Sequence, residues 1–157
     1  MNGRPNQKLI RPMGYSDLSE ILEIERHVTY HPWTKNAFSE SLRIGNQCWV
    51  IEDNSRVIAY LVQSICTEES HILNLGVLIS RQGQGIGRVL VKKACADAAE
   101  NGVIKIVLEV RSSNLIAQQL YESEGFLVFG RRHNYYRSCN HTEDALVMVR
   151  NLGPDWL

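Results

Sequence analysis

The sequence predicts an α/β fold, with a mixed central β-sheet flanked by helices. The run Val103–Val110 is almost entirely apolar, which is typical of a central strand buried on both faces. Long amphipathic helical patterns begin near Gly85 and Asn114, on either side of that strand. The turn residues Asp53–Arg56 join two apolar runs into an antiparallel hairpin. Crossover helices together with hairpins indicate a mixed sheet.

Length and composition limit the function classes. The 157 residues are 44% hydrophobic, which suits one compact domain over residues 1–157, with a loose polar tail at residues 1–7. The formal net charge is 0, and no apolar run approaches the roughly 20 residues that span a bilayer. We therefore expect a cytoplasmic protein, a monomer or weak oligomer, with no direct nucleic-acid or membrane partner.

The cysteines and histidines do not form a pattern that predicts a metal site. The cysteines are widely spaced and lack a C-x-x-C pair; they are Cys48, Cys66, Cys95 and Cys139. This spacing favours reduced thiols over a disulfide frame or a zinc knuckle. His27 and His31 are four residues apart, but Pro32 follows at once, so we expect a helix-end or loop role and no metal.

The first elements are a strand and a helix. Leu9–Arg11 is a short strand that Pro12 ends. Asp17 is expected to cap the helix, with Glu20 three residues later completing a capping-box pattern. The apolar face of this helix consists of Leu18, Ile21, Leu22 and Ile24.

A second helix and three strands follow. Thr34 is placed to cap a short helix that carries Phe38 and Leu42. Apolar runs bounded by turn residues predict strands at Gln47–Glu52, Val57–Ser64 and His71–Val77.

The longest predicted helix begins at Gly85 and runs to about Asn101, where Gly102 ends it. Its apolar positions repeat every four residues and are Ile86, Leu90, Ala94 and Ala98. The positions expected to face solvent are Arg88, Lys92 and Glu100.

The predicted order ends with a helix and two strands. After the central strand, Asn114 is expected to cap a helix that runs through Glu124 and ends at Gly125. Leu127–Tyr136 and Ala145–Asn151 are the closing strands. The complete order is β-α-α-β-β-β-α-β-α-β-β.

The stretch Asn74–Gly87 combines a strand end, a loop with three alternate glycines and the start of a helix. Glycines let the backbone approach a ligand, and the first N–H groups of a helix have no intrahelical partner. We therefore predict a site for a phosphate-bearing cofactor. The Rossmann pattern fails because Arg88 or Leu90 stands where its last glycine belongs, although Glu109 lies near the distance of its acid. A P-loop fails because Arg88 follows Gly87.

A better match is Gln82–Gly87, which reads Q-G-Q-G-I-G and fits the pattern Q/R-x-x-G-x-G/A. This pattern is similar to the acetyl-CoA pyrophosphate loop of the GNAT acyltransferase superfamily. The simpler interpretation is a glycine turn that only begins a helix. Further segments extend the resemblance: Pro32–Thr34, Leu108–Asn114, Leu120–Phe126, Arg131–Tyr136 and Glu143–Ala145.

Two of these segments point to one branch of the superfamily. Leu108–Asn114 and Leu120–Phe126 resemble the L-E-V-R-x-S-N and L-Y-x-x-x-G-F signatures of its N-terminal acetyltransferases. The resemblance covers nearly the whole chain and is closest to the bacterial ribosomal-protein-alanine N-acetyltransferases (RimI type). It implies a GNAT fold and acetyl-CoA as co-substrate. It also implies acetyl transfer to a protein N-terminal amine, that of the N-terminal alanine of a small-subunit ribosomal protein.

The resemblance also implies which residues contact acetyl-CoA. They are Leu75, Gly76, Val77, Gln82, Gly83, Gln84, Gly85, Ile86, Gly87, Arg88, Asn114 and Tyr121. Backbone N–H groups of the loop suit the pyrophosphate, and one near Val77 suits the thioester oxygen. Relatives carry an acidic-proline turn after this strand, where the present chain has Leu78–Ser80. We expect that departure to loosen the turn or to make its apolar side chains pack elsewhere.

Glu109 and Tyr121 are the candidates for catalysis. Glu109 ends the buried strand, where burial makes a carboxylate a better base. The residues alone equally allow a salt bridge between Glu109 and Arg111, whereas the resemblance implies a general base that acts through water. Tyr121 lies seven residues after Asn114, on the same helix face, from which it could protonate the leaving thiolate. The alternatives are core packing for Tyr121 and simple capping for Asn114.

The candidates for acceptor binding are Trp33, Tyr135 and Tyr136. The resemblance implies that they form the walls of a peptide groove, as in the related enzymes. The alternative for Trp33 is packing at a helix start. The alternative for the two tyrosines is an amphipathic strand end with solvated arginines. At pH 7 roughly a tenth of α-amino groups are neutral, whereas well under a thousandth of lysine side chains are neutral. An N-terminal acceptor therefore suits a single glutamate base. Two other functions stay open: acetylation of lysine or small amines, and non-catalytic acyl-CoA sensing or ribosome binding.

Overall fold

The computed structural model describes residues 8–138 and 140–154. The elements are β1 (Lys8–Pro12), η1 (Tyr15–Asp17), α1 (Leu18–Val28), α2 (Lys35–Arg43), β2 (Gln47–Asp53), β3 (Arg56–Ile65), β4 (Glu69–Val77), η2 (Ile79–Arg81), α3 (Ile86–Glu100), β5 (Lys105–Arg111), α4 (Leu115–Ser123), β6 (Leu127–Ser138) and β7 (His141–Asn151). The α/β class and the order of strands and α-helices are as predicted, with two short 3-10 helices added. The predicted tail at residues 1–7, and Cys139, lie outside the described residues.

The seven strands form one mixed sheet in the order β1-β2-β3-β4-β5-β7-β6. The described residues group into two compact units, one within residues 8–62 and 74–90, the other within residues 63–73 and 91–154. In the part of the chain that the structure describes, no helix is long and apolar enough to cross a membrane.

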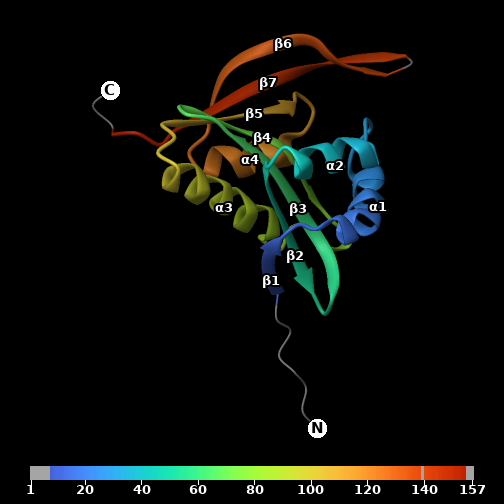
Figure 1. Ribbon diagram of the computed structural model, residues 1–157. Helices are drawn as coiled ribbons and strands as arrows, with labels where there is room; N and C mark the ends of the chain where they lie inside the picture. The colour runs from blue at the N-terminus through green and yellow to red at the C-terminus, as the bar shows by residue number, and fades with distance from the viewer. Residues whose placement is uncertain (1–7, 139, 155–157) are drawn as a thin grey trace. The chain divides into compact units, whose positions relative to one another are not determined.

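The first unit is built on the antiparallel β1–β2 pair and the β2–β3 hairpin, with α1 and α2 beside them (Figure 1). The hairpin turn places Asn54 and Ser55 at positive φ, 50° and 64°, a pair of left-handed residues that suits the twist of two strands joined by a tight turn. One hydrophobic cluster fills this unit: Met13, Leu18, Ile21, Ile24, Phe38, Cys48, Val50, Val57, Tyr60 and Val62.

The predicted cap of α1 is wrong. Asp17 precedes the helix, but its side chain does not cap it. The carboxylate instead accepts from the Gly14 N–H at 2.8 Å and from both terminal nitrogens of Arg11 at 2.8 Å. Glu20 accepts from the Val57 N–H at 3.2 Å. Ion-pairing with a strand residue therefore outweighed the local capping pattern, and the pKa of Asp17 is lowered mainly by its hydrogen bonds to Arg11.

The second helix begins as predicted. Thr34 Oγ1 accepts from the Ala37 N–H at 3.2 Å, and Phe38 is fully buried. His27 lies in the last turn of α1, with Nδ1 2.7 Å from the Glu23 carbonyl oxygen. Within the described residues, no group of three or more His, Cys, Asp or Glu side chains is arranged to hold a metal ion. Cys48, Cys66 and Cys95 are free thiols, as expected.

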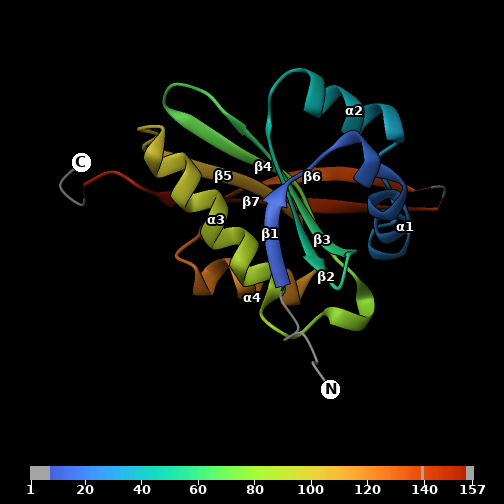
Figure 2. The ribbon, with the colours of Figure 1, turned by 60° about the horizontal axis from the view of Figure 1, so that its bottom comes forward.

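The second unit is built on β5, which runs parallel to β4 and antiparallel to β7. Helices α3 and α4 lie on the same side of β5 and β7, while β6 and β7 extend as a long ribbon (Figures 1 and 2). β5 begins two residues later than the predicted strand. The C-terminal ends of α3 and α4 match the prediction. Gly102 has φ of 72° and Gly125 has φ of 89°, left-handed conformations that glycine adopts without strain.

Burial of β5 is less complete than predicted. Ile106, Leu108 and Val110 are 0–6% exposed. On the opposite face Val107 is 9% exposed, whereas Glu109 and Arg111 are only half-buried. Successive side chains of a strand point to opposite faces, and in this unit α3 and α4 cover one face of β5 (Figure 1). The apolar run therefore marks a central strand, but not one that is equally buried on both faces.

Candidate active site

The strand end that leads into the glycine loop is firmly held. β4 ends at Val77, and the next N–H, that of Leu78, donates to the Ile58 carbonyl at 2.8 Å. The Leu78 side chain packs against the hydrophobic cluster of the first unit, and Ile79 is exposed in the short helix η2. Of the two outcomes expected for the departure at Leu78–Ser80, packing elsewhere is thus observed for Leu78.

The glycine loop requires its glycines for backbone reasons. Gly83 and Gly85 have φ of 76° and 81°, in the left-handed region that side chains disfavour. Gln82 Nε2 donates to the Val77 carbonyl at 3.1 Å, which ties the loop to the strand end. The Val89 N–H donates to the Gly85 carbonyl at 3.2 Å, so α3 starts directly after the loop. A helix start in this position favours an anion such as a pyrophosphate.

A further contact fixes the loop to the rest of the first unit. Arg81 Nη2 lies 2.8 Å from Asp53 Oδ2, at the end of β2. Asp53 is 3% exposed, so the ion pair ties the turn before the glycines to a buried carboxylate. The sequence did not indicate this pair, because 27 positions separate the two residues.

Gly76 is required for packing. A Cβ built on Gly76 would overlap the ring and hydroxyl of Tyr60, a fully buried side chain on β3. The hydroxyl of Tyr60 in turn donates to Glu25 on α1. Burial, and then the Glu25 charge, raise the pKa of Tyr60, which keeps its hydroxyl a donor. Tyr60 and Glu25 were not predicted from the sequence, although Glu25 follows Ile21 by four residues and so lies on the apolar stripe of α1.

Replacing Gly76 with alanine is expected to destabilise the protein by about 1–3 kcal/mol, since the methyl group and Tyr60 cannot both keep their places. Urea unfolding of the purified variant measures this. Gly130→Ala is the matched control, because a Cβ there meets nothing within 4 Å, and its stability should change by less than about 0.5 kcal/mol. Equal stabilities of the two variants would contradict the packing role of Gly76.

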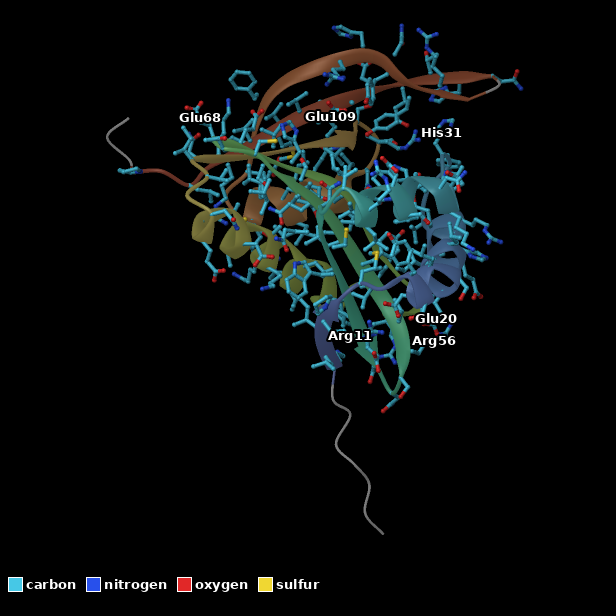
Figure 3. The ribbon with its side chains drawn as sticks, in the orientation of Figure 1. Arg11, Glu20, His31, Arg56, Glu68 and Glu109 are labelled. Carbon is cyan, nitrogen blue, oxygen red and sulfur yellow. The ribbon has the colours of Figure 1, made fainter. Side chains whose placement is uncertain are left out.

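In the second unit, Glu109 lies on β5 with its side chain 28% exposed (Figure 3). Its Oε1 is 3.3 Å from Nε of Arg132 on β6. The predicted alternative was a salt bridge to Arg111, but Arg111 pairs with Glu143 on β7 at 3.3 Å. Glu143 also accepts from the Ser113 N–H at 2.7 Å and thereby holds the loop that precedes α4.

Tyr121 is buried on α4, with its ring 5.8 Å from that of Phe126 in an edge contact. Burial raises the pKa of Tyr121 to about 12, with a smaller contribution from Tyr136. The hydroxyl is therefore protonated at neutral pH. Asn114 caps α4 as predicted, with Oδ1 accepting from the Ala117 N–H at 3.2 Å.

The two tyrosines that are candidates for binding the acceptor peptide lie next to a β-bulge. The β6–β7 register shifts between Arg132 and Tyr136, and Asn134 there has φ of 53°. The ring centroids of Tyr135 and Tyr136 are 5.1 Å apart. Burial, and then the Glu109 charge, raise the pKa of Tyr136. A bulge changes the direction in which the following side chains point, so this one sets the orientation of both rings.

The arginines beside these tyrosines are not simply solvated, as one alternative assumed. The Arg111 guanidinium lies 4.1 Å from the Tyr136 ring centroid, and that of Arg132 lies 5.1 Å from Tyr135. Arg131 Nη1 donates to Asp144 Oδ2 at 2.9 Å. Trp33 belongs to the other unit, where it is half-buried and packs 5.2 Å from Phe38 between ring centroids. This packing leaves part of the Trp33 side chain exposed.

A model of the acetyltransferase (GNAT) family matches residues 16–126, more than half of the chain. The chain belongs to the GNAT acetyltransferase family. The family and the enzyme class predicted for this GNAT protein are therefore confirmed.

Individual proteins of known sequence or structure are similar to this GNAT acetyltransferase over most of its length. The [ribosomal protein bS18]-alanine N-acetyltransferase of Escherichia coli (strain K12) is 31% identical over 134 residues, covering 85% of this chain and 90% of that protein. The crystal structure of the ribosomal-protein-S18-alanine N-acetyltransferase from Escherichia coli superimposes with a TM-score of 0.87 at 28% identity, covering 96% and 99% of the two chains. A protein from Salmonella typhimurium whose structure holds its cofactor acetyl-CoA shares the fold, with a TM-score of 0.81 at 22% identity and coverages of 97% and 98%.

Proposed function

We propose that this GNAT acetyltransferase transfers the acetyl group of acetyl-CoA to the N-terminal alanine of a small-subunit ribosomal protein. The observation that carries this proposal is the 31% identity to an enzyme with that acceptor over 85% of the chain. The α-amino acceptor also suits the available base, because about a tenth of such amines are neutral at pH 7.

The glycine loop is proposed to hold the cofactor. Backbone N–H groups from Gly83 to Arg88, at the start of α3, bind the pyrophosphate. Leu75, Gly76 and Val77 run along the thioester arm, and the Val77 N–H stabilises the negative charge that develops on the thioester oxygen. The left-handed glycines and the bond from Gln82 to the Val77 carbonyl support this role, since they give the loop one fixed conformation.

Glu109 and Tyr121 are proposed to move the protons. The acceptor nitrogen forms a bond to the thioester carbon, and the carbon–sulfur bond then breaks. Glu109 takes the proton of the attacking amine through a water molecule, and Tyr121 gives its proton to the leaving thiolate. The partial exposure of Glu109 supports access by water, and the protonated Tyr121 hydroxyl is the form that can donate.

Trp33, Tyr135 and Tyr136 are proposed to contact the acceptor peptide. Tyr135 is 47% exposed, so its ring is available to a peptide, and the bulge at Asn134 fixes its direction. Asn114 is proposed to hydrogen-bond the pantetheine arm through its amide nitrogen, because its amide oxygen already caps α4.

A panel of three peptides tests the acceptor. The first has a free N-terminal alanine, the second is the same peptide with a blocked N-terminus and an internal lysine, and the third is the blocked peptide without lysine. We expect acetylation of the first peptide only, measured by the mass gain and by release of the CoA thiol. Reaction of the second alone would favour a lysine acetyltransferase. Binding of acetyl-CoA without turnover of any amine would favour a sensing module.

A further inference from the structure

Glu25 is a buried carboxylate that has no part in the proton transfers above. It lies on α1, is 2% exposed, and receives hydrogen bonds from two strands and from the connection between α1 and α2. Oε1 accepts from the Trp33 N–H at 3.2 Å and from Asn74 Nδ2 at 3.1 Å, and Oε2 accepts from the Tyr60 hydroxyl. A carboxylate is costly to bury unless donors satisfy it, so this convergence requires several segments to be in place at once.

Two of the three donors belong to fixed structure. Tyr60 on β3 and Asn74 on β4 lie in strands of the central sheet, and the Leu78 N–H bonds to Ile58 directly after β4. Tyr60 also packs against Gly76, at the strand end proposed to carry the thioester. The side of the cluster that the sheet provides is therefore held independently of Glu25.

The third donor belongs to the connection between α1 and α2, residues 29–34. Within it, the Thr29 N–H bonds to the Glu25 carbonyl at 3.3 Å and the His31 N–H bonds to Thr29 Oγ1 at 3.3 Å. Both bonds stay close to α1. The Trp33 N–H is different, because its acceptor is a side chain that is itself bonded to β3 and β4.

We propose that Glu25 is a positioning residue that fixes the 29–34 connection against the end of β4. It thereby sets where the acceptor amine lies relative to the thioester. The inference rests on the proposed function, in which Trp33 contacts the acceptor and Leu75–Val77 contact acetyl-CoA. The role requires hydrogen-bond acceptors at the carboxyl group and does not require its negative charge.

The variants Glu25→Gln and Glu25→Met separate this role from others. In glutamine, the amide oxygen can accept from Trp33 and Asn74 while the amide nitrogen donates to the Tyr60 oxygen, so the three pairings are kept and only the Tyr60 bond changes direction. Methionine has a similar length and no oxygen, so the link to the connection is lost. Glu20→Met is the matched control, because Glu20 lies on the same helix but binds the Val57 N–H, at the end of α1 opposite the connection (Figure 3).

Kinetics with the N-terminal alanine peptide give the main test. Glu25→Met should raise the peptide KM by about 10-fold to 100-fold, since small displacements of a positioning group cost this much. The acetyl-CoA affinity of Glu25→Met should stay within about threefold of the wild-type value. In Glu25→Gln and Glu20→Met, both the peptide KM and the acetyl-CoA affinity should stay within about threefold of wild type. An unchanged peptide KM in Glu25→Met, an equal loss in Glu25→Gln, or a parallel loss of acetyl-CoA affinity would each overturn the proposal.

Hydrogen exchange of the Trp33 amide gives a second readout that needs no activity. The amide should exchange at least about tenfold faster in Glu25→Met than in wild type, and at the wild-type rate in Glu25→Gln. If wild type acetylates no peptide, the proposed function fails while this measurement still decides the positioning role. If Glu25→Met does not fold, Asn74→Ala replaces it, with faster Trp33 exchange expected and an unchanged rate overturning the proposal.

Discussion

Replacing Glu109 with glutamine is expected to lower turnover by about 10²-fold to 10⁴-fold, the usual contribution of a general base. Glutamine keeps the shape of the side chain, and its amide oxygen can still accept from Arg132, which lies 3.3 Å away in the native protein. It cannot take the proton of the attacking amine. Acetyl-CoA affinity should therefore stay within about twofold, measured by calorimetry beside the initial rate of acetyl transfer.

Glu100→Gln is the control for this experiment. Glu100 is exposed at the end of α3, so the same chemical change there should leave the rate and the affinity as they are in wild type. Wild-type turnover in Glu109→Gln would remove Glu109 as the base. A loss of acetyl-CoA binding in that variant would point to a cofactor-binding role instead.

Replacing Tyr121 with phenylalanine is expected to lower kcat by about 10²-fold or more, since the thiolate then leaves without a proton donor. The ring keeps its edge contact with Phe126, 5.8 Å between centroids, so the fold should be retained. Steady-state kinetics and thermal unfolding measure the two effects separately. Tyr15→Phe removes the hydroxyl of a tyrosine that is 61% exposed and should leave kcat unchanged. A fully active Tyr121→Phe would assign Tyr121 to core packing alone.

The raised pKa of Tyr121 also predicts how stability depends on pH. The phenol ionises near pH 10 in the unfolded chain and at about 12 in the folded protein, because burial disfavours the charged form. Its contribution to stability is therefore complete below about pH 10 and is lost as the pH rises through about 12. Urea unfolding at pH 9, 10 and 11 should show a shallower decline for Tyr121→Phe than for wild type. Parallel declines would contradict the pKa shift.

The elements and the glycine loop were predictable from local patterns in the sequence. The caps at Thr34 and Asn114 and the helix ends at Gly102 and Gly125 were predictable because their hydrogen bonds and φ angles involve residues only a few positions apart. The glycine loop was predictable for the same reason. The family could be inferred from short segments whose residues stay together in the chain.

The partners of the charged side chains depend on how the elements pack together. Asp17 binds Arg11 instead of capping α1, and Glu109 binds Arg132, 23 positions further along the chain. Arg132 reaches Glu109 only through the pairing of β6 with β7 and of β7 with β5. A periodic pattern shows which residues share a face, but not which strand will lie beside them.

Glu25 shows this division most clearly. Its place on the apolar stripe of α1 was visible in the sequence, yet its role depends on Trp33, Tyr60 and Asn74. A buried carboxylate is stable only where enough donors converge on it, and these donors come from positions 8, 35 and 49 residues away. Local patterns determine the elements, whereas satisfying a buried polar group depends on how distant segments of the chain pack together.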